Sequence, residues 1–147
     1  NPKRRDENQE TPRRAWAKFD LVPTSVMNFA EGTRFTHEKH AAQASPYIYL
    51  RKTKAGALAL ALNAMGEQFH SLIDATIVYP DGIPSFWDFL CGNTPRVVLR
   101  VRQLPIPPEF CTGDYEGDTV FRGTVHRWLA DIWEFKDAEI AQVMQQK

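Results

Sequence analysis

Cysteine is scarce in this sequence: Cys91 and Cys111 are the two cysteines among 147 residues. Two cysteines cannot build the disulfide framework of a small secreted domain, so we expect a reducing compartment. Long apolar runs are missing as well, because the longest one, Ala55 to Leu62, falls far below the roughly 20 residues of a membrane helix. We therefore expect any membrane anchor to lie outside this chain, or the domain to dock on a membrane only peripherally.

Charge of one sign is not in excess either. The 18 Lys and Arg residues balance the 18 Asp and Glu residues, and the formal net charge is zero. This balance argues against a polyanion-binding protein, and the arginines near the amino terminus lack the aromatic and basic repeat of a nucleic-acid interface. The four histidines and two cysteines also lack the spacing of metal ligands. We expect no nucleic-acid partner and no bound metal.

What the sequence does contain is enough apolar material for a real core. Hydrophobic residues make up 43% of the chain, and its length corresponds to one domain or most of one. The start, Asn1 to Arg5, is charged, has no initiator Met and does not resemble a signal peptide. We expect a piece of a longer protein, with residues 1–9 frayed.

Apolar periodicity predicts strands that alternate with helices, and hence an α/β fold. The predicted elements are a helix at 10–20, a buried strand at 26–30, a loop or one short helix at 37–45, a helix at 55–68, a strand at 71–79, a short apolar helix or loop at 84–92, a strand at 96–104, and a helix at 118–145 capped by Asp118 or Thr119. In the strand at 96–104 the apolar side chains point one way. Arg96, Arg100 and Arg102 point the other way, and we expect their side to face solvent.

The stretch from Val26 to Thr36 points most directly to a function. Its apolar run ends at Gly32, which permits a tight turn, and Arg34 follows. A guanidinium suits a phosphate or carboxylate, and ligands of α/β sheets gather at the carboxyl ends of strands. Lys52 and Lys54 precede a predicted helix, whose free N–H groups attract anions. The pattern predicts an anion site, although the two lysines could also be ordinary linker charges.

Glu31-Gly32-Thr33-Arg34 resembles the Glu-Gly-Thr-Arg motif of the glycerolipid acyltransferases, the family that acylates lysophosphatidic acid. The resemblance continues, in order and rough spacing, through Phe35-Thr36, Lys39-His40, the stretch from Arg51 to Gly56, Ile77-Val78-Tyr79 and Lys136-Asp137. It runs from about Arg5 to Asp137 and matches the second half of that family's domain. The first half, with the catalytic His-x-x-x-x-Asp, is expected upstream of this chain.

The resemblance implies a fold and an activity for the whole chain. It implies that residues 1–147 are the carboxyl-terminal part of one acyltransferase domain, with a short, mostly buried sheet flanked by helices and a long amphipathic last helix. The implied reaction moves a fatty acyl group from acyl-CoA or acyl-carrier protein to the free hydroxyl of lysophosphatidic acid or a related lysophospholipid. No prosthetic group is implied. The implied location is the cytoplasmic face of a membrane, which in a bacterium is the inner membrane.

The resemblance also assigns site residues. It places the acceptor phosphate at Glu31, Gly32, Thr33, Arg34 and Lys54, with Lys52, His37, Tyr79 and Pro80 as further candidates. Ala55 stands where relatives often have glycine, which affects how closely the backbone approaches a ligand. The apolar segment 84–92 could line an acyl-chain groove, seat the domain on a membrane, or belong to a local core.

This chain does contain one His-x-x-x-x-Asp sequence, at His126 and Asp131, but we do not read it as the catalytic pair. Positions i and i+5 lie about 140° apart on a helix, so the two side chains could not meet. The motif also follows Glu-Gly-Thr-Arg, whereas in the resembled family it precedes it. We expect the chain to be inactive alone. The competing interpretation is a module that binds phosphate or anionic lipid without catalysis.

Overall fold

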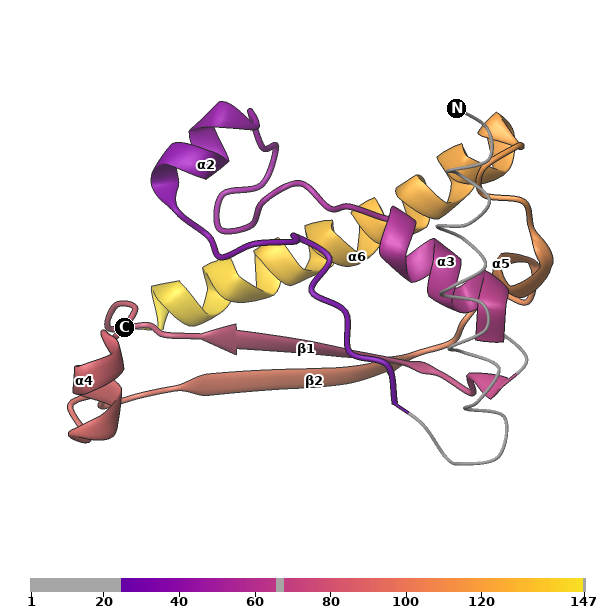
Figure 1. Ribbon diagram of the computed structural model, residues 1–147. Coiled ribbons are helices and arrows are strands. Elements are labelled where there is room, and N and C mark those ends of the chain that lie inside the picture. The colour runs from indigo at the N-terminus through magenta and orange to yellow at the C-terminus, as the bar shows by residue number, and fades with distance from the viewer. Residues whose placement is uncertain (1–24, 66–67, 147) are drawn as a thin grey trace.

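The computed structural model describes residues 25–65 and 68–146. There the chain forms a small α/β fold with a two-stranded antiparallel sheet and a long carboxyl-terminal helix (Figure 1). The elements are α2 (His37–Ala42), α3 (Gly56–Met65), β1 (Leu72–Val78), α4 (Phe86–Leu90), β2 (Val98–Leu104), α5 (Glu109–Thr112) and α6 (Thr119–Gln145). The predicted frayed start, the helix at 10–20 and residues 21–24 lie outside the described residues.

Helix α6 is the longest element and was predicted almost to its ends. The carboxylate of Asp118 caps its first turn, accepting from the N–H groups of Val120 and Phe121 over 2.8 and 3.1 Å. Because an α-helix rises about 1.5 Å per residue, α6 is about 40 Å long. It runs between the sheet and α2 (Figure 1). Its apolar stripe is therefore able to join both sides of the molecule.

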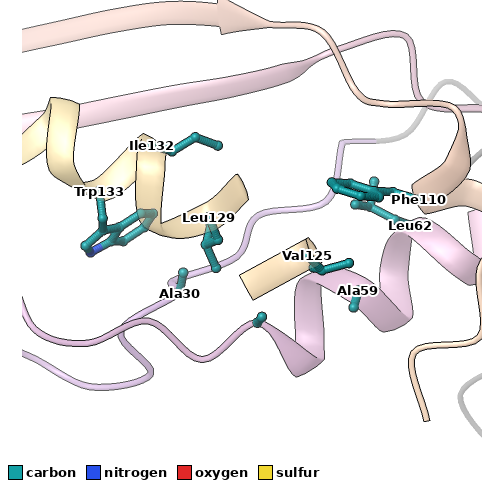
Figure 2. Close-up of a cluster of buried hydrophobic side chains, with 9 residues drawn as sticks. Ala30, Ala59, Leu62, Phe110, Val125, Leu129, Ile132 and Trp133 are labelled. Atoms are coloured by element: carbon teal, nitrogen blue, oxygen red, sulfur yellow. The ribbon is translucent and has the colours of Figure 1, made fainter. Parts of the chain in front are cut away.

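The main hydrophobic core lies where α3, α5 and the first half of α6 meet (Figure 2). Its buried members are Ala30, Ala55, Ala59, Leu62, Phe110, Val125, Leu129, Ile132 and Trp133. Phe110 packs edge-on against Trp128, with ring centroids 5.1 Å apart, a geometry that aromatic pairs favour. The expected amphipathic last helix is thus confirmed, because its apolar side chains Val125, Leu129, Ile132 and Trp133 lie in this core. Ala30 brings the segment before α2 into it.

The two strands pair from Leu72 opposite Leu104 to Val78 opposite Val98. Side chains alternate between the faces of a strand, so Asp74, Thr76 and Val78 share one face of β1, and all are buried. The other face is apolar, and its large side chains are exposed. We call it the outer sheet face; it carries Ile73, Ile77, Leu99 and Val101, each more than half exposed. The sheet was predicted to be mostly buried between helices, and this is wrong for its outer face.

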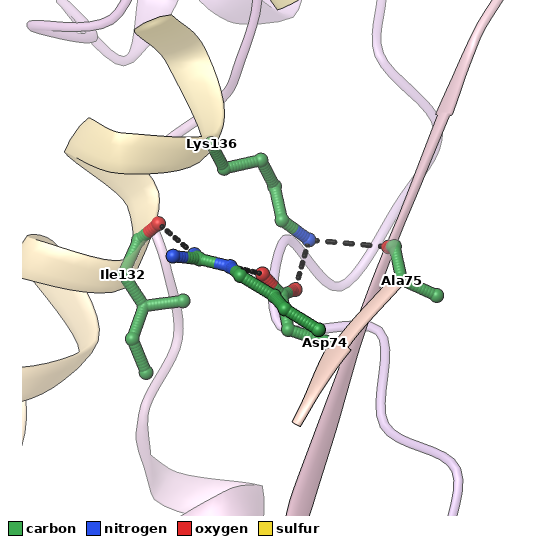
Figure 3. A network of polar contacts seen from close by, with 5 residues as sticks. Asp74, Ala75, Ile132 and Lys136 are labelled. Atoms are coloured by element: carbon green, nitrogen blue, oxygen red, sulfur yellow. Dashed lines mark hydrogen bonds and ion pairs between the residues drawn. The ribbon is translucent and has the colours of Figure 1, made fainter. Parts of the chain in front are cut away.

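The predicted solvent face of the strand at 96–104 is wrong for Arg102, whereas Arg100 is exposed and the side chain of Arg96 is 41% exposed. Arg102 points toward α6, where its Nε donates to Asp74 over 2.8 Å and its Nη2 donates to the carbonyl of Ile132 over 3.0 Å (Figure 3). Lys136 of α6 approaches Asp74 to 2.5 Å and donates to the carbonyl of Ala75 over 3.2 Å. Arg102 can lie on this partly buried face because the carboxylate of Asp74 pairs with it and with Lys136. The aliphatic side chains of the strand lie on the exposed face.

The predicted buried strand at 26–30 is wrong. The segment is irregular, and it does not pair with either strand of the described sheet. Met27 and Phe29 are 83% and 78% exposed, whereas Ala30 at the end of the run is buried. A short apolar run marks a strand only when a neighbour supplies the hydrogen bonds of its backbone.

Helix α4 is exposed, so its interpretation as local core is wrong. Phe86 and Trp87 are both 71% exposed. The helix is held by its own cap: the side chain of Ser85 accepts from the N–H of Asp88 over 3.1 Å, and the Asp88 carboxylate accepts from the N–H of Ser85 over 3.2 Å. This reciprocal box satisfies two N–H groups locally, so the helix forms without burial of its aromatic side chains.

Candidate functional site

The Glu31–Arg34 motif forms an exposed turn before α2. The N–H of Gly32 donates to the carbonyl of Phe29 over 2.8 Å, and Gly32 has a φ of +74°, which glycine adopts without strain. A Cβ at this position would lie 3.2 Å from Cδ and 3.4 Å from Nζ of Lys54. The predicted turn is therefore confirmed, and the missing side chain leaves room for Lys54 to lie across it.

Two hydrogen bonds donated by main-chain N–H groups join the segment before α3 to this turn. The N–H of Lys54 donates to the carbonyl of Ala30 over 2.7 Å. The N–H of Arg51 donates to the carboxylate of Glu31 over 3.2 Å. Residues 20 or more positions apart thus form one structure, which brings Glu31, Gly32, Thr33 and Lys54 together. Ala55 does not enter it, because this side chain is buried in the core.

The site is positively charged and open to solvent. Arg34, Lys52 and Lys54 are exposed, and none of them forms an ion pair with a carboxylate in the part of the chain that the structure describes. The one carboxylate of the motif, Glu31, is already engaged by the Arg51 main chain. An arginine that follows a tight turn and a lysine that lies across it, unpaired with any described carboxylate, suit a phosphate or carboxylate ligand.

The histidines of α2 have different environments. His37 is exposed at the start of α2, edge-on to Phe35 with ring centroids 5.5 Å apart. Nε2 of His40 lies 2.7 Å from the carbonyl of Tyr47 and must carry the proton, because a carbonyl only accepts. Burial, reinforced by the carboxylate of Glu134 and others, raises the pKa of Tyr47. The hydrogen bond from His40 to the carbonyl of Tyr47 holds the loop after α2. His37 stays the candidate for ligand contact.

Tyr79 and Pro80 lie at the carboxyl end of β1, in a turn closed by the N–H of Gly82 and the carbonyl of Tyr79 over 3.1 Å. Pro80 is buried. Within residues 25–65 and 68–146, no hydrogen bond or ion pair connects this turn with the Glu31–Arg34 turn. The structure does not bring these two candidates to the anion site.

Two residues support the site in roles that the sequence analysis did not predict, because it named them only as parts of the motif resemblance. One is Arg51, whose main chain and side chain both contact the turn. Asp137 of α6 accepts from the N–H groups of Ile48 and Tyr49 over 2.9 and 2.8 Å, and so holds the segment leading to Arg51 against α6. Asp137 follows Arg51 by 86 positions in the chain, so no local pattern could reveal its role.

The histidines of the described residues contact backbone carbonyls or a tyrosine hydroxyl where their hydrogen bonds are seen. The hydrogen bonds of His40 and His70 go to backbone carbonyls, and Nε2 of His126 lies 3.0 Å from the hydroxyl of Tyr115. His126 and Asp131 both belong to the continuous helix α6, so their side chains diverge as expected. In the described chain, no three His, Cys, Asp or Glu residues cluster as metal ligands would, and no helix is long and apolar enough to cross a membrane.

Comparison with known proteins found no match among protein-family models, curated proteins or solved structures.

Proposed function

We propose that this chain supplies the acceptor-phosphate site of a glycerolipid acyltransferase of the lysophosphatidic acid acyltransferase type. One observation carries the proposal. Lys54 lies across Gly32 and is bonded to Ala30 through its main chain, so the two segments that resemble the family's motifs form one cationic turn. A phosphomonoester bound there would meet the guanidinium of Arg34 and the ammonium of Lys54, the groups that bind phosphate well in proteins.

In the proposed reaction, the free hydroxyl of the acceptor attacks the thioester of acyl-CoA or acyl-carrier protein. An O-acyl bond forms, the C–S bond breaks, and the thiol leaves with the proton that a general base took from the hydroxyl. By resemblance the base is the histidine of a His-x-x-x-x-Asp segment upstream of Glu-Gly-Thr-Arg. The role of Arg34 and Lys54 is positioning, which can lower a barrier by several kcal/mol (of order 7 or more in ideal geometry). The proposed setting is phospholipid synthesis at the cytoplasmic face of a membrane.

The binding half of the proposal can be tested on this chain. Titration calorimetry with short-chain lysophosphatidic acid should detect a complex, and Arg34→Ala should weaken it at least tenfold, because a charged hydrogen bond is worth about 1.5–3 kcal/mol and 1.4 kcal/mol is tenfold. Arg127→Ala is the matched control, since Arg127 is an exposed arginine on α6 that should not affect affinity. Equal affinity in wild type and Arg34→Ala would remove Arg34 from the site.

The catalytic half requires the natural-length protein. Thiol release from acyl-CoA in the presence of lysophosphatidic acid should occur there, and kcat/KM should fall more than tenfold in Arg34→Ala. Binding without turnover in the natural-length protein would instead support the second candidate, a non-catalytic module for phosphate or anionic lipid. That alternative would use the same cationic turn without chemistry.

A further inference from the structure

Arg51 is buried, and no carboxylate of the described residues forms an ion pair with its guanidinium. It is 5% exposed, although arginine is almost never fully buried unless paired. Among the described residues no Asp or Glu lies within ion-pair distance of its guanidinium, and its Nε makes no hydrogen bond. Burial of an ionised group without a partner is costly, so this arginine calls for an explanation beyond packing.

The polar contacts of Arg51 all go to the anion-binding turn. Nη1 donates to the hydroxyl of Thr33 and makes a long contact of 3.5 Å with the carbonyl of the same residue. The main-chain N–H of Arg51 donates to Glu31, on the other side of Gly32. One residue thereby fastens the turn on both sides of its flexible glycine.

We propose that Arg51 is the positioning residue of the anion site: it fixes the Glu31–Thr33 turn so that Arg34 is presented to the ligand, and its unpaired charge raises the positive potential beneath the turn. A bound anion would supply a negative charge that no described carboxylate places within ion-pair distance of this guanidinium. The inference rests on the proposed function, because it concerns the same site. It adds a residue that does not touch the ligand and acts through Thr33.

The test combines two conservative changes in the full chain. Arg51→Lys keeps the charge but loses the planar fork that reaches Thr33. Thr33→Val removes the accepting hydroxyl at an exposed position and leaves the guanidinium in place. Each variant should bind short-chain lysophosphatidic acid about three- to tenfold more weakly by calorimetry. The double variant should be no weaker than the worse single one, because both changes break one interaction.

A merely structural role predicts a different result. If Arg51 only supported folding, Arg51→Lys would lower the urea midpoint, and its folded fraction would bind with wild-type affinity. Wild-type affinity in both folded variants, or losses that multiply in the double variant, would overturn the inference. Thr33→Val keeps the test decisive should Arg51→Lys fail to fold, since unchanged affinity in Thr33→Val alone would refute action through this hydroxyl.

The inference and the proposed function fail in distinguishable ways. If wild type binds lysophosphatidic acid and Arg34→Ala weakens binding, the anion site stands, and the Arg51 and Thr33 variants decide the positioning role. If wild type binds neither lysophosphatidic acid nor inorganic phosphate, the anion site itself is refuted, and the positioning role with it.

Discussion

Removal of the Asp74 carboxylate should destabilise the protein more than any other single change to the polar contacts between the sheet and α6. Asp74 is the one acidic member of the cluster in Figure 3, and its side chain is 6% exposed. The side chains of its two cationic partners, Lys136 and Arg102, are 9% and 24% exposed. Asp74→Ala would leave Lys136 with the carbonyl of Ala75 and the ring of Trp133, and Arg102 with the carbonyl of Ile132 and the ring of Phe135, but neither cation with a carboxylate among the described residues.

The magnitude follows from the charges left unpaired. Breaking a buried ion pair by removing one partner costs about 3–5 kcal/mol, and we expect this range for Asp74→Ala. Lys136→Met should cost less, about 1–3 kcal/mol, because Asp74 keeps Arg102 and the lost interactions are hydrogen bonds to a charged group and a carbonyl. Since about 1 kcal/mol shifts the Tm by 2–4 °C at this size, Asp74→Ala should lower the Tm by roughly 10 °C.

The assay is urea unfolding followed by circular dichroism, with the free energy of unfolding compared between variants. Asp81→Ala is the control, because the pair of Asp81 and Arg96 is exposed and long at 3.9 Å, and should be worth less than about 1 kcal/mol. Replacing Asp74 and Arg102 by Leu and Lys136 by Met should restore much of the stability, because no member of the cluster then carries an unpaired charge. An Asp74→Ala cost equal to that of Asp81→Ala would refute the reasoning.

Three further predictions concern the turn, the loop and α4. Gly32→Ala should cost about 1–2 kcal/mol of stability through backbone strain, and it should weaken lysophosphatidic acid binding because the new Cβ displaces Lys54. Gly92→Ala is the control, because Gly92 has a φ of +72° and open space around it. That variant should show the strain without the loss of binding. Asp137→Ala should speed amide hydrogen exchange at Ile48 and Tyr49 well above that of β1 amides, and unchanged exchange would contradict the loop anchor. Hydrogen bonds from Ser85 lower the pKa of Asp88. The folded state therefore favours the ionised form of Asp88. The stability that this form contributes is full above the usual pKa of an aspartic acid and is lost as the pH falls through the lowered pKa. The α4 amide signals should therefore shift only below about pH 4, and Asp88→Asn should abolish that shift.

The long periodic elements of the fold could be predicted from sequence. The helix expected at 118–145 and its Asp118 cap agree with α6, and the strands expected at 71–79 and 96–104 contain β1 and β2. In each of them many residues repeat one pattern, so single exceptions do not hide it. The segment at 26–30 offered four apolar side chains and no longer pattern, and there the prediction failed.

Alternation identifies the two faces of a strand, but it does not say which face is covered. In the strand at 96–104, Val97, Leu99 and Val101 indicated the core and the arginines indicated solvent. The structure exposes these apolar side chains and turns Arg102 toward α6, while Arg100 is exposed as expected. The decisive partners are Asp74 and Lys136, 28 positions before and 34 positions after Arg102. Asp74 in the middle of an apolar strand was the available signal, because a buried carboxylate requires cations on the same face.

The candidate site was predictable in its cations and not in its support. Arg34 and Lys54 could be selected by residue type and by the turn at Gly32. The hydrogen bond of Lys54 to Ala30 and the burial of Arg51 depend on how α3 packs against the segment before α2, which no local pattern records.

Lys136 and Asp137 are neighbours in sequence but reach different parts of the molecule, one the sheet and the other the loop at Ile48 and Tyr49. Successive residues of a helix point about 100° apart, so these two contacts together fix the rotation of α6 about its own axis. Deleting or inserting one residue between Trp133 and Lys136 would turn both side chains away from their partners at once. Helix α6 should therefore accept many substitutions on its exposed side, but no change of length in that interval.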